Sequence, residues 1–188
     1  MKVHVTRSYL DMARSVIDTR VHGDPQTAES EDAVFALMSC TYVFSFMALT
    51  AFASSHLHSL WKTDDSALRK KYESCASFEE LMAGPLKELK VALKELACQL
   101  GMPPLHKAKP AAWRELNELL KGYRDYFIHP NPEHFHAHVT ATGNLAWSFP
   151  SRVATDIITH FFVSTGTETP SWLAQSQLRS RGFDFVRI

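Results

Sequence analysis

The sequence predicts an all-α protein, with residues 1–188 forming one helical bundle of about five to seven helices. A small β-hairpin is expected as an insertion around residues 134–149. Three observations lead to this prediction. Apolar residues recur at steps of three and four along most of the chain, only 7 Gly and 9 Pro interrupt it, and strict alternation is confined to one short segment. At 188 residues and 45% hydrophobic, the chain is long enough to bury a core as one domain.

The first two helices are defined by their apolar residues and by the signals that end them. Residues 6–22 carry an apolar stripe that stops at Gly23. A second helix is expected to start after Ser30, which would act as its N-cap, and to run to about Trp61.

The segment 33–53 contains 21 residues without a charge, which has two explanations. It is long enough to cross a bilayer, or it is a central helix that other helices surround on all sides. The residues just before it are acidic (Glu29, Glu31 and Asp32), and amphipathic helices elsewhere in the chain are available to cover it. No secretory signal is visible at the N-terminus. We therefore expect a cytoplasmic protein without a membrane span.

The middle of the chain predicts further helices in order. A charged connection over 62–73 contains at most one short helix, and Ser77 with Glu80 forms a capping box for the next turn. The helix over 85–100 carries a leucine stripe, and the helix that starts at Pro110 carries a second stripe and ends at His129-Pro130. The stripe residues are Leu86, Leu89, Leu93, Leu96 and Leu100 in one, and Trp113, Leu116, Leu120, Tyr123 and Phe127 in the other.

The period then changes to two. Apolar residues alternate with histidines over 134–141 and recur at Leu145, Trp147 and Phe149, which is typical of two paired strands. Helices over 151–163 and near 171–181 follow, and the tail is expected to add a short strand.

Composition and motifs exclude several functions. With 20 Lys+Arg against 20 Asp+Glu, the chain has no net charge that would attract nucleic acid or anionic lipid as a whole. Three cysteines fit neither a disulfide framework nor a CxxC-type zinc site. The sequence also contains no glycine-rich phosphate loop, HExxH or GxSxG motif.

The strongest candidate for chemistry is the segment 123–130, at the end of an amphipathic helix. Arg124 lies at the margin of the apolar stripe, and His129 precedes a proline that biases it out of the helix. A guanidinium grips phosphate oxygens and offsets developing charge, and an imidazole titrates near neutrality as a general acid or base. This pair suits phosphodiester chemistry.

Arg124, Asp125 and His129, with four residues between the Arg and the His, resemble the HEPN superfamily (higher eukaryote and prokaryote nucleotide-binding domains). The resemblance implies a helical bundle that forms a homodimer with the two motifs facing each other. It implies a metal-independent endoribonuclease without a cofactor, in which the ribose 2′-hydroxyl attacks the adjacent phosphate. Many members are toxins or phage-defence effectors, so RNA and a partner antitoxin are the implied partners. Tyr126 and Lys121 are supporting candidates for RNA binding, whereas Asp125 occupies a position where Asn is commoner in active members.

Two alternatives stay open. In the first, the protein is a non-catalytic, dimeric HEPN-like binding or scaffold module, and Arg124 and His129 only stabilise the end of a helix. Alternatively, His134, His136 and His138 project from one strand face and bind a metal, although the first and third lie about 13 Å apart, so that at most two share an ion. A solvated polar face explains these three histidines without a metal.

Overall fold

The computed structural model describes residues 2–18, 28–123 and 145–173 of the chain. Eight helices lie wholly within these ranges, and residues 171–173 are also helical. The longer helices are α1 (Lys2–Asp18), α2 (Ala28–Trp61), α5 (Leu89–Gln99), α7 (Pro110–Tyr123) and α9 (Leu145–Ser164). The short ones are α3 (Ala67–Lys71), α4 (Phe78–Ala83) and α6 (Leu105–Ala108). The helical class agrees with the prediction, but the described part alone already exceeds the expected five to seven helices.

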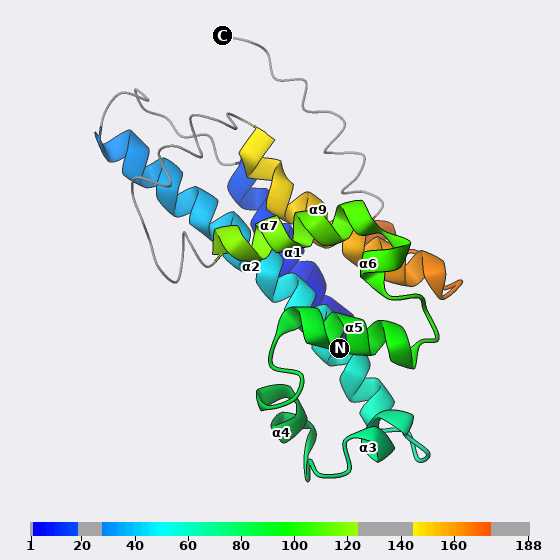
Figure 1. Cartoon of the computed structure of the whole chain (residues 1–188). Helices are drawn as coiled ribbons and strands as arrows, with labels where there is room; N and C mark the ends of the chain where they lie inside the picture. Colours follow the sequence, from blue (N-terminus) through cyan, green and yellow to red (C-terminus); the bar gives the residue numbers. More distant parts are fainter. Residues whose placement is uncertain (1, 19–27, 124–144, 174–188) are drawn as a thin grey trace.

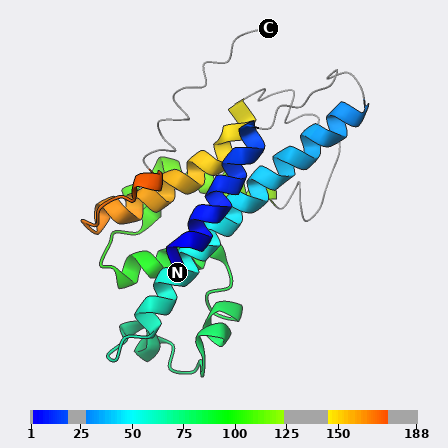
Figure 2. The same cartoon turned by 180° about the vertical axis from the view of Figure 1, so that it is seen from behind.

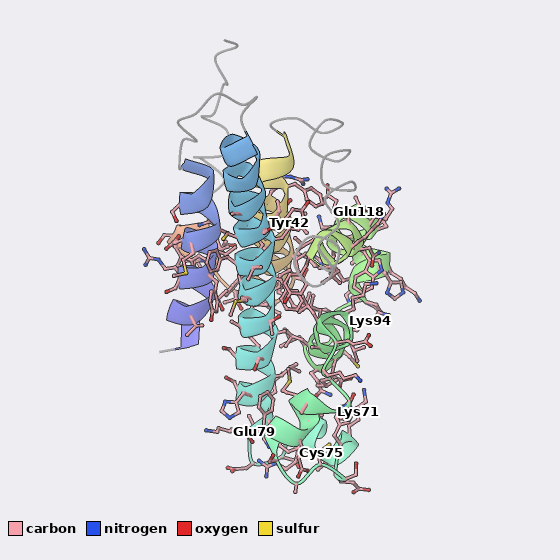
Figure 3. All side chains as sticks on the ribbon, turned by 90° about the vertical axis from the view of Figure 1, so that its left-hand side faces the viewer. Tyr42, Lys71, Cys75, Glu79, Lys94 and Glu118 are labelled. Atoms are coloured by element: carbon pink, nitrogen blue, oxygen red, sulfur yellow. The ribbon has the colours of Figure 1, made fainter. Side chains whose placement is uncertain are left out.

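Helix α2 is the common packing partner of the bundle (Figure 1). Its 34 residues pack against α1, α5, α7 and α9, and α3 and α4 lie near its C-terminal end. Seen from behind, α1 runs alongside α2 (Figure 2). In the side view, α1 lies on one side of α2, and α5 and α7 lie on the other (Figure 3). This arrangement explains why the middle of α2 is apolar on every face.

The leucine stripes form the core as predicted. Leu93 and Leu96 of α5 and Leu116 of α7 are fully buried, and Leu86 is buried although it lies before the first residue of α5. The expected start at residue 85 was therefore too early, since α5 begins at Leu89. The apolar spacing nevertheless identified the buried face correctly.

The capping predictions have mixed outcomes. The Ser77 hydroxyl accepts a hydrogen bond from the Glu80 amide at 3.1 Å, which confirms the expected cap of α4. The Glu80 carboxylate accepts from the Ala76 amide at 2.8 Å rather than from the amide of Ser77. The Ser30 prediction was wrong, because α2 begins at Ala28 and Ser30 lies inside its first turn.

The predicted β-hairpin at 134–149 was wrong in the part that the structure describes. Residues 145–149 belong to α9, a helix that continues through Pro150 to Ser164, and no strand occurs in the described ranges. Leu145 and Phe149 lie four positions apart, so this short apolar run fits a helical period as well as an alternating one. Packing decided between them: Phe149 packs against the core, and the Arg152 guanidinium lies 5.6 Å from its ring centroid. Residues 134–144 lie outside the described part.

Helix α2 also passes the test for a bilayer span by length and composition. Its segment Ser39–Trp61 is apolar enough to cross a membrane, and 44% of the most apolar window is buried inside the protein. Among the described helices it is the single one with this property. Core helices of soluble proteins pass the same test, and α1, α5, α7 and α9 pack against α2.

Candidate functional site

Most of the predicted site residues follow directly after α7. Arg124, Asp125, Tyr126 and His129 lie outside the described residues, and so do the three hairpin histidines His134, His136 and His138. Lys121 is described, and its side chain is exposed in the last turn of α7. The structure therefore places the helix that leads into the Arg–His motif.

The C-terminal end of α7 is fixed against α2. The ring of Tyr123, the last residue of α7, stacks on Phe46 with ring centroids 4.3 Å apart and an angle of 9° between the planes. Tyr42 lies one turn earlier on α2 and is buried, and it extends toward the side where α7 and α9 pack (Figure 3). Aromatic pairs of this kind hold two helices in a defined register. The chain therefore leaves α7 at a fixed point beside the middle of α2.

A charged cluster that was not predicted from the sequence joins α7 to α9. Both oxygens of the Glu115 carboxylate accept hydrogen bonds from the Arg152 guanidinium, at 3.0 and 3.2 Å. The carboxylate of Asp156 lies 3.5 Å from the same guanidinium. Burial raises the pKa of the Asp156 carboxyl above its ordinary range, and the charge of Glu115 adds to this rise while Arg152 opposes it.

His160 lies one turn after Asp156 on α9. Its Nδ1 atom is 3.2 Å from the Ser164 hydroxyl, and its buried Nε2 atom has no hydrogen-bond partner among the residues that the structure places. Burial lowers the pKa of the imidazole, and the charge of Lys109 lowers it further. A neutral His160 is thus favoured at pH 7.

The cluster that joins α7 to α9 contains the residue types found in active sites. Its hydrogen bonds and ion pairs, however, link the two helices to each other. Two carboxylates occupy the Arg152 guanidinium, so that it has little capacity left for a substrate phosphate. A sequence signal did exist, since Arg152, Asp156 and His160 follow one another at four-residue steps and therefore share one face of a helix. Glu115 lies 37 positions before Arg152, and only the packing of α7 on α9 brings them together.

A second ionic network holds α3 against α5. The buried Glu95 carboxylate accepts hydrogen bonds from Lys71 Nζ at 2.7 Å, from the Tyr72 hydroxyl at 3.0 Å and from Gln99 Nε2 at 2.8 Å. Burial alone would raise the pKa of this carboxyl, but the three hydrogen bonds outweigh it and lower the pKa below its ordinary value. Both oxygens of the Glu95 carboxylate therefore have hydrogen-bond partners, and we assign this network a role in stabilising the fold.

A third group of residues differs from these two because its lysines form no ion pair with any residue in the described ranges. The Lys90 and Lys94 ammonium groups of α5 lie 5.6 and 5.2 Å from the ring centroid of Trp113 on α7. The ring of His106 on α6 lies 6.0 Å from the same indole. We call Lys90, Lys94, His106 and Trp113 the basic–aromatic patch.

Within the ranges that the structure describes, no three His, Cys, Asp or Glu side chains gather as a metal site would require. Cys40, Cys75 and Cys98 are free thiols, the first two partly buried and the third exposed. The three comparisons with known proteins found no family model, no curated protein and no solved structure that matches this chain.

Proposed function

We propose that this protein is a HEPN-like, metal-independent endoribonuclease that acts as a homodimer. The observation that carries the proposal is the position of α7. This amphipathic helix packs against α2 and α9, ends at the Tyr123–Phe46 stack, and is followed at once by Arg124. An Arg directly after this helix in the sequence, with a His five positions later, suits transfer of a phosphodiester.

The proposed reaction uses Arg124 and His129 in different roles. The 2′-hydroxyl of a ribose attacks the adjacent phosphorus, the bond to the 5′-oxygen of the next nucleotide breaks, and a cyclic phosphate and a free 5′-hydroxyl result. Arg124 binds the phosphate oxygens and offsets the charge that develops on them. His129 transfers the protons as a general acid or base. Lys121 and Tyr126 support RNA binding, and Asp125 follows Arg124 in the sequence.

The test is cleavage of a structured RNA in EDTA by the wild type and by the variants Arg124→Ala and His129→Ala. We expect cleavage to persist without metal and to fall by about 10²-fold or more in each variant. Arg7→Ala is the matched control, because Arg7 is exposed on α1 and its one ion pair within the described ranges is with Asp11. Equal cleavage by the wild type and both motif variants would assign the activity to a contaminant and refute the proposal.

A non-catalytic, dimeric HEPN-like binding or scaffold module is the second candidate. It is in keeping with the two ionic networks, in which Glu95 and Arg152 bind other side chains of the fold. In that case, His129→Ala lowers the melting temperature and the wild type turns over no RNA. Sedimentation of the purified chain tests the homodimer. Co-purification from the native cytoplasm tests for a partner antitoxin and for the proposed location.

A further inference from the structure

Lys90 and Lys94 are like charges placed side by side without a counter-charge. They lie four positions apart on α5, so their side chains are neighbours on one helix face. No acidic residue stands three or four positions away from either lysine, where it could form a helical ion pair. Neither lysine forms an ion pair with any residue that the structure describes.

Several other basic residues in the described ranges do have an acidic partner. Arg7 and Arg14 share Asp11, Lys70 pairs with Asp65, and Lys71 pairs with Glu95. Lysines beside an aromatic ring are favoured by the ring's electrons, but two such charges on one indole repel each other. A bound anion would relieve this repulsion.

The surroundings extend the positive charge. Lys107 follows His106 on α6 and Arg114 follows Trp113 on α7, and both side chains are exposed. From Leu86 to Lys121 the chain has seven Lys or Arg and four Glu, although the whole chain is neutral. Two of those glutamates, Glu95 and Glu115, are already paired. Glu88 and Glu118 remain, and the labelled side chains show Lys94 and Glu118 extending from separate helices on the side away from α1 (Figure 3).

We infer that the basic–aromatic patch binds single-stranded RNA, with Lys90 and Lys94 on the phosphates and Trp113 against a base. The patch offers both groups that a nucleotide needs, a pair of cations and a flat, partly exposed ring. An acidic peptide would use the lysines but would leave the indole without a stacking partner. Charge complementarity together with the ring therefore favours a nucleic acid strand over a protein.

The patch is separate from the proposed catalytic motif. Trp113 lies in the first turn of α7, and Tyr123 ends the same helix ten residues later, about 15 Å along its axis. A strand that follows α7 from the patch would reach the point where Arg124 begins. Binding at the patch does not require Arg124 or His129, so it holds whether or not the protein cleaves RNA.

The experiment is fluorescence anisotropy with a dye-labelled oligoadenylate of about 20 nucleotides, which exceeds the site sizes usual for such surfaces. The full chain carries His129→Ala so that the RNA stays intact, and the buffer contains EDTA. The double variant Lys90→Gln/Lys94→Gln is compared with Lys62→Gln/Lys70→Gln, which removes two exposed lysines that lie directly after α2 and on α3 and do not contact Trp113. Circular dichroism confirms that each protein is folded.

We expect the patch variant to bind about tenfold more weakly at about 50 mM salt and the control variant to bind as the parent does. The slope of log affinity against log salt should decrease by about 1.4, because each phosphate contact on a single strand contributes about 0.7. RNA that stacks on Trp113 should also quench the tryptophan fluorescence of the protein. Trp113→Phe keeps an aromatic ring at this position and should reduce that quenching.

Three results would overturn the inference. They are no binding by the parent protein, equal affinity and salt slope for the patch and control variants, and equally tight, lysine-dependent binding of polyglutamate, which would indicate an acidic protein partner. The outcome is separable from the ribonuclease proposal. Binding without cleavage contradicts only the proposed activity, whereas cleavage with unchanged binding by the patch variant contradicts only the patch.

Discussion

Replacing Glu95 with alanine should destabilise the protein by about 2–3 kcal/mol, and the magnitude follows from its three hydrogen bonds. The bonds from Tyr72 and Gln99 are partly buried, and each contributes about 1 kcal/mol to the free energy of unfolding. The Lys71 side chain is 49% exposed whereas that of Glu95 is 7% exposed. Since Lys71 regains water when its partner is removed, its ion pair adds only about 0–1 kcal/mol.

The measurement is urea unfolding at pH 7 followed by circular dichroism, with Glu73→Ala as the matched control. Glu73 is an exposed glutamate that follows α3 directly, and its removal should change the free energy of unfolding by less than about 0.5 kcal/mol. If Glu95→Ala is as stable as this control, the network does not contribute to stability and the reasoning is wrong.

The same pair of proteins provides a pH test whose sign is fixed. The pKa of Glu95 is lowered from 4.5, so its contribution is complete above pH 4.5 and is lost as the pH falls through the folded-state pKa. The pKa of Lys71 is raised from 10.5 by its bond to Glu95, so its contribution is complete below pH 10.5 and is lost as the pH rises through the folded-state value. Burial and the bond to Glu95 also raise the pKa of Tyr72 from 10.0, so its contribution is complete below pH 10.0. The stability difference between wild type and Glu95→Ala should therefore be constant between pH 4.5 and pH 10.0 and shrink outside this range.

Four further predictions concern other parts of the molecule. Tyr123→Ala removes the stack on Phe46 and should lower the free energy of unfolding by about 1–3 kcal/mol in urea, with a parallel loss of any RNA cleavage; unchanged stability would show that the stack does not hold α7. Ser77→Ala should cost about 1 kcal/mol by the same assay, because the cap of α4 is lost. Asp156→Asn should stabilise the protein at pH 7 by up to about 1 kcal/mol, since burial raises the pKa of this carboxyl, and the gain should vanish below pH 3.8. If α2 is a core helix, carbonate extraction should release the chain from any membranes, whereas retention in the pellet would make Ser39–Trp61 a span.

The local periodicity of the sequence was sufficient for the helices whose stripes are long. Leu89, Leu93 and Leu96, at steps of four and three, identified the buried face of α5, and the Ser77–Glu80 spacing identified the cap of α4. The alternation at 145–149 misled because it was only five residues long, a length at which a helix and a strand can bury the same side chains. Contacts with the core decided that α9 is helical there.

The candidate site was less predictable because its partners come from separate helices. The positions of Lys90 and Lys94 can be read as a pair of helical neighbours, but their approach to Trp113 depends on how α5 packs relative to α7. The bridge between Glu115 and Arg152 spans 37 positions and has no local signature. The role of Arg124 and His129 remains a prediction from the sequence.

The length of α2 has a consequence for dissecting the protein into pieces. At 34 residues it is about 50 Å long, and α1, α5, α7 and α9 all bury apolar residues against it. A fragment that starts after Trp61 would keep both the patch and the motif but would expose the inner faces of three helices. Such truncations should aggregate rather than fold, so point substitutions in the intact chain are the appropriate way to separate binding from catalysis.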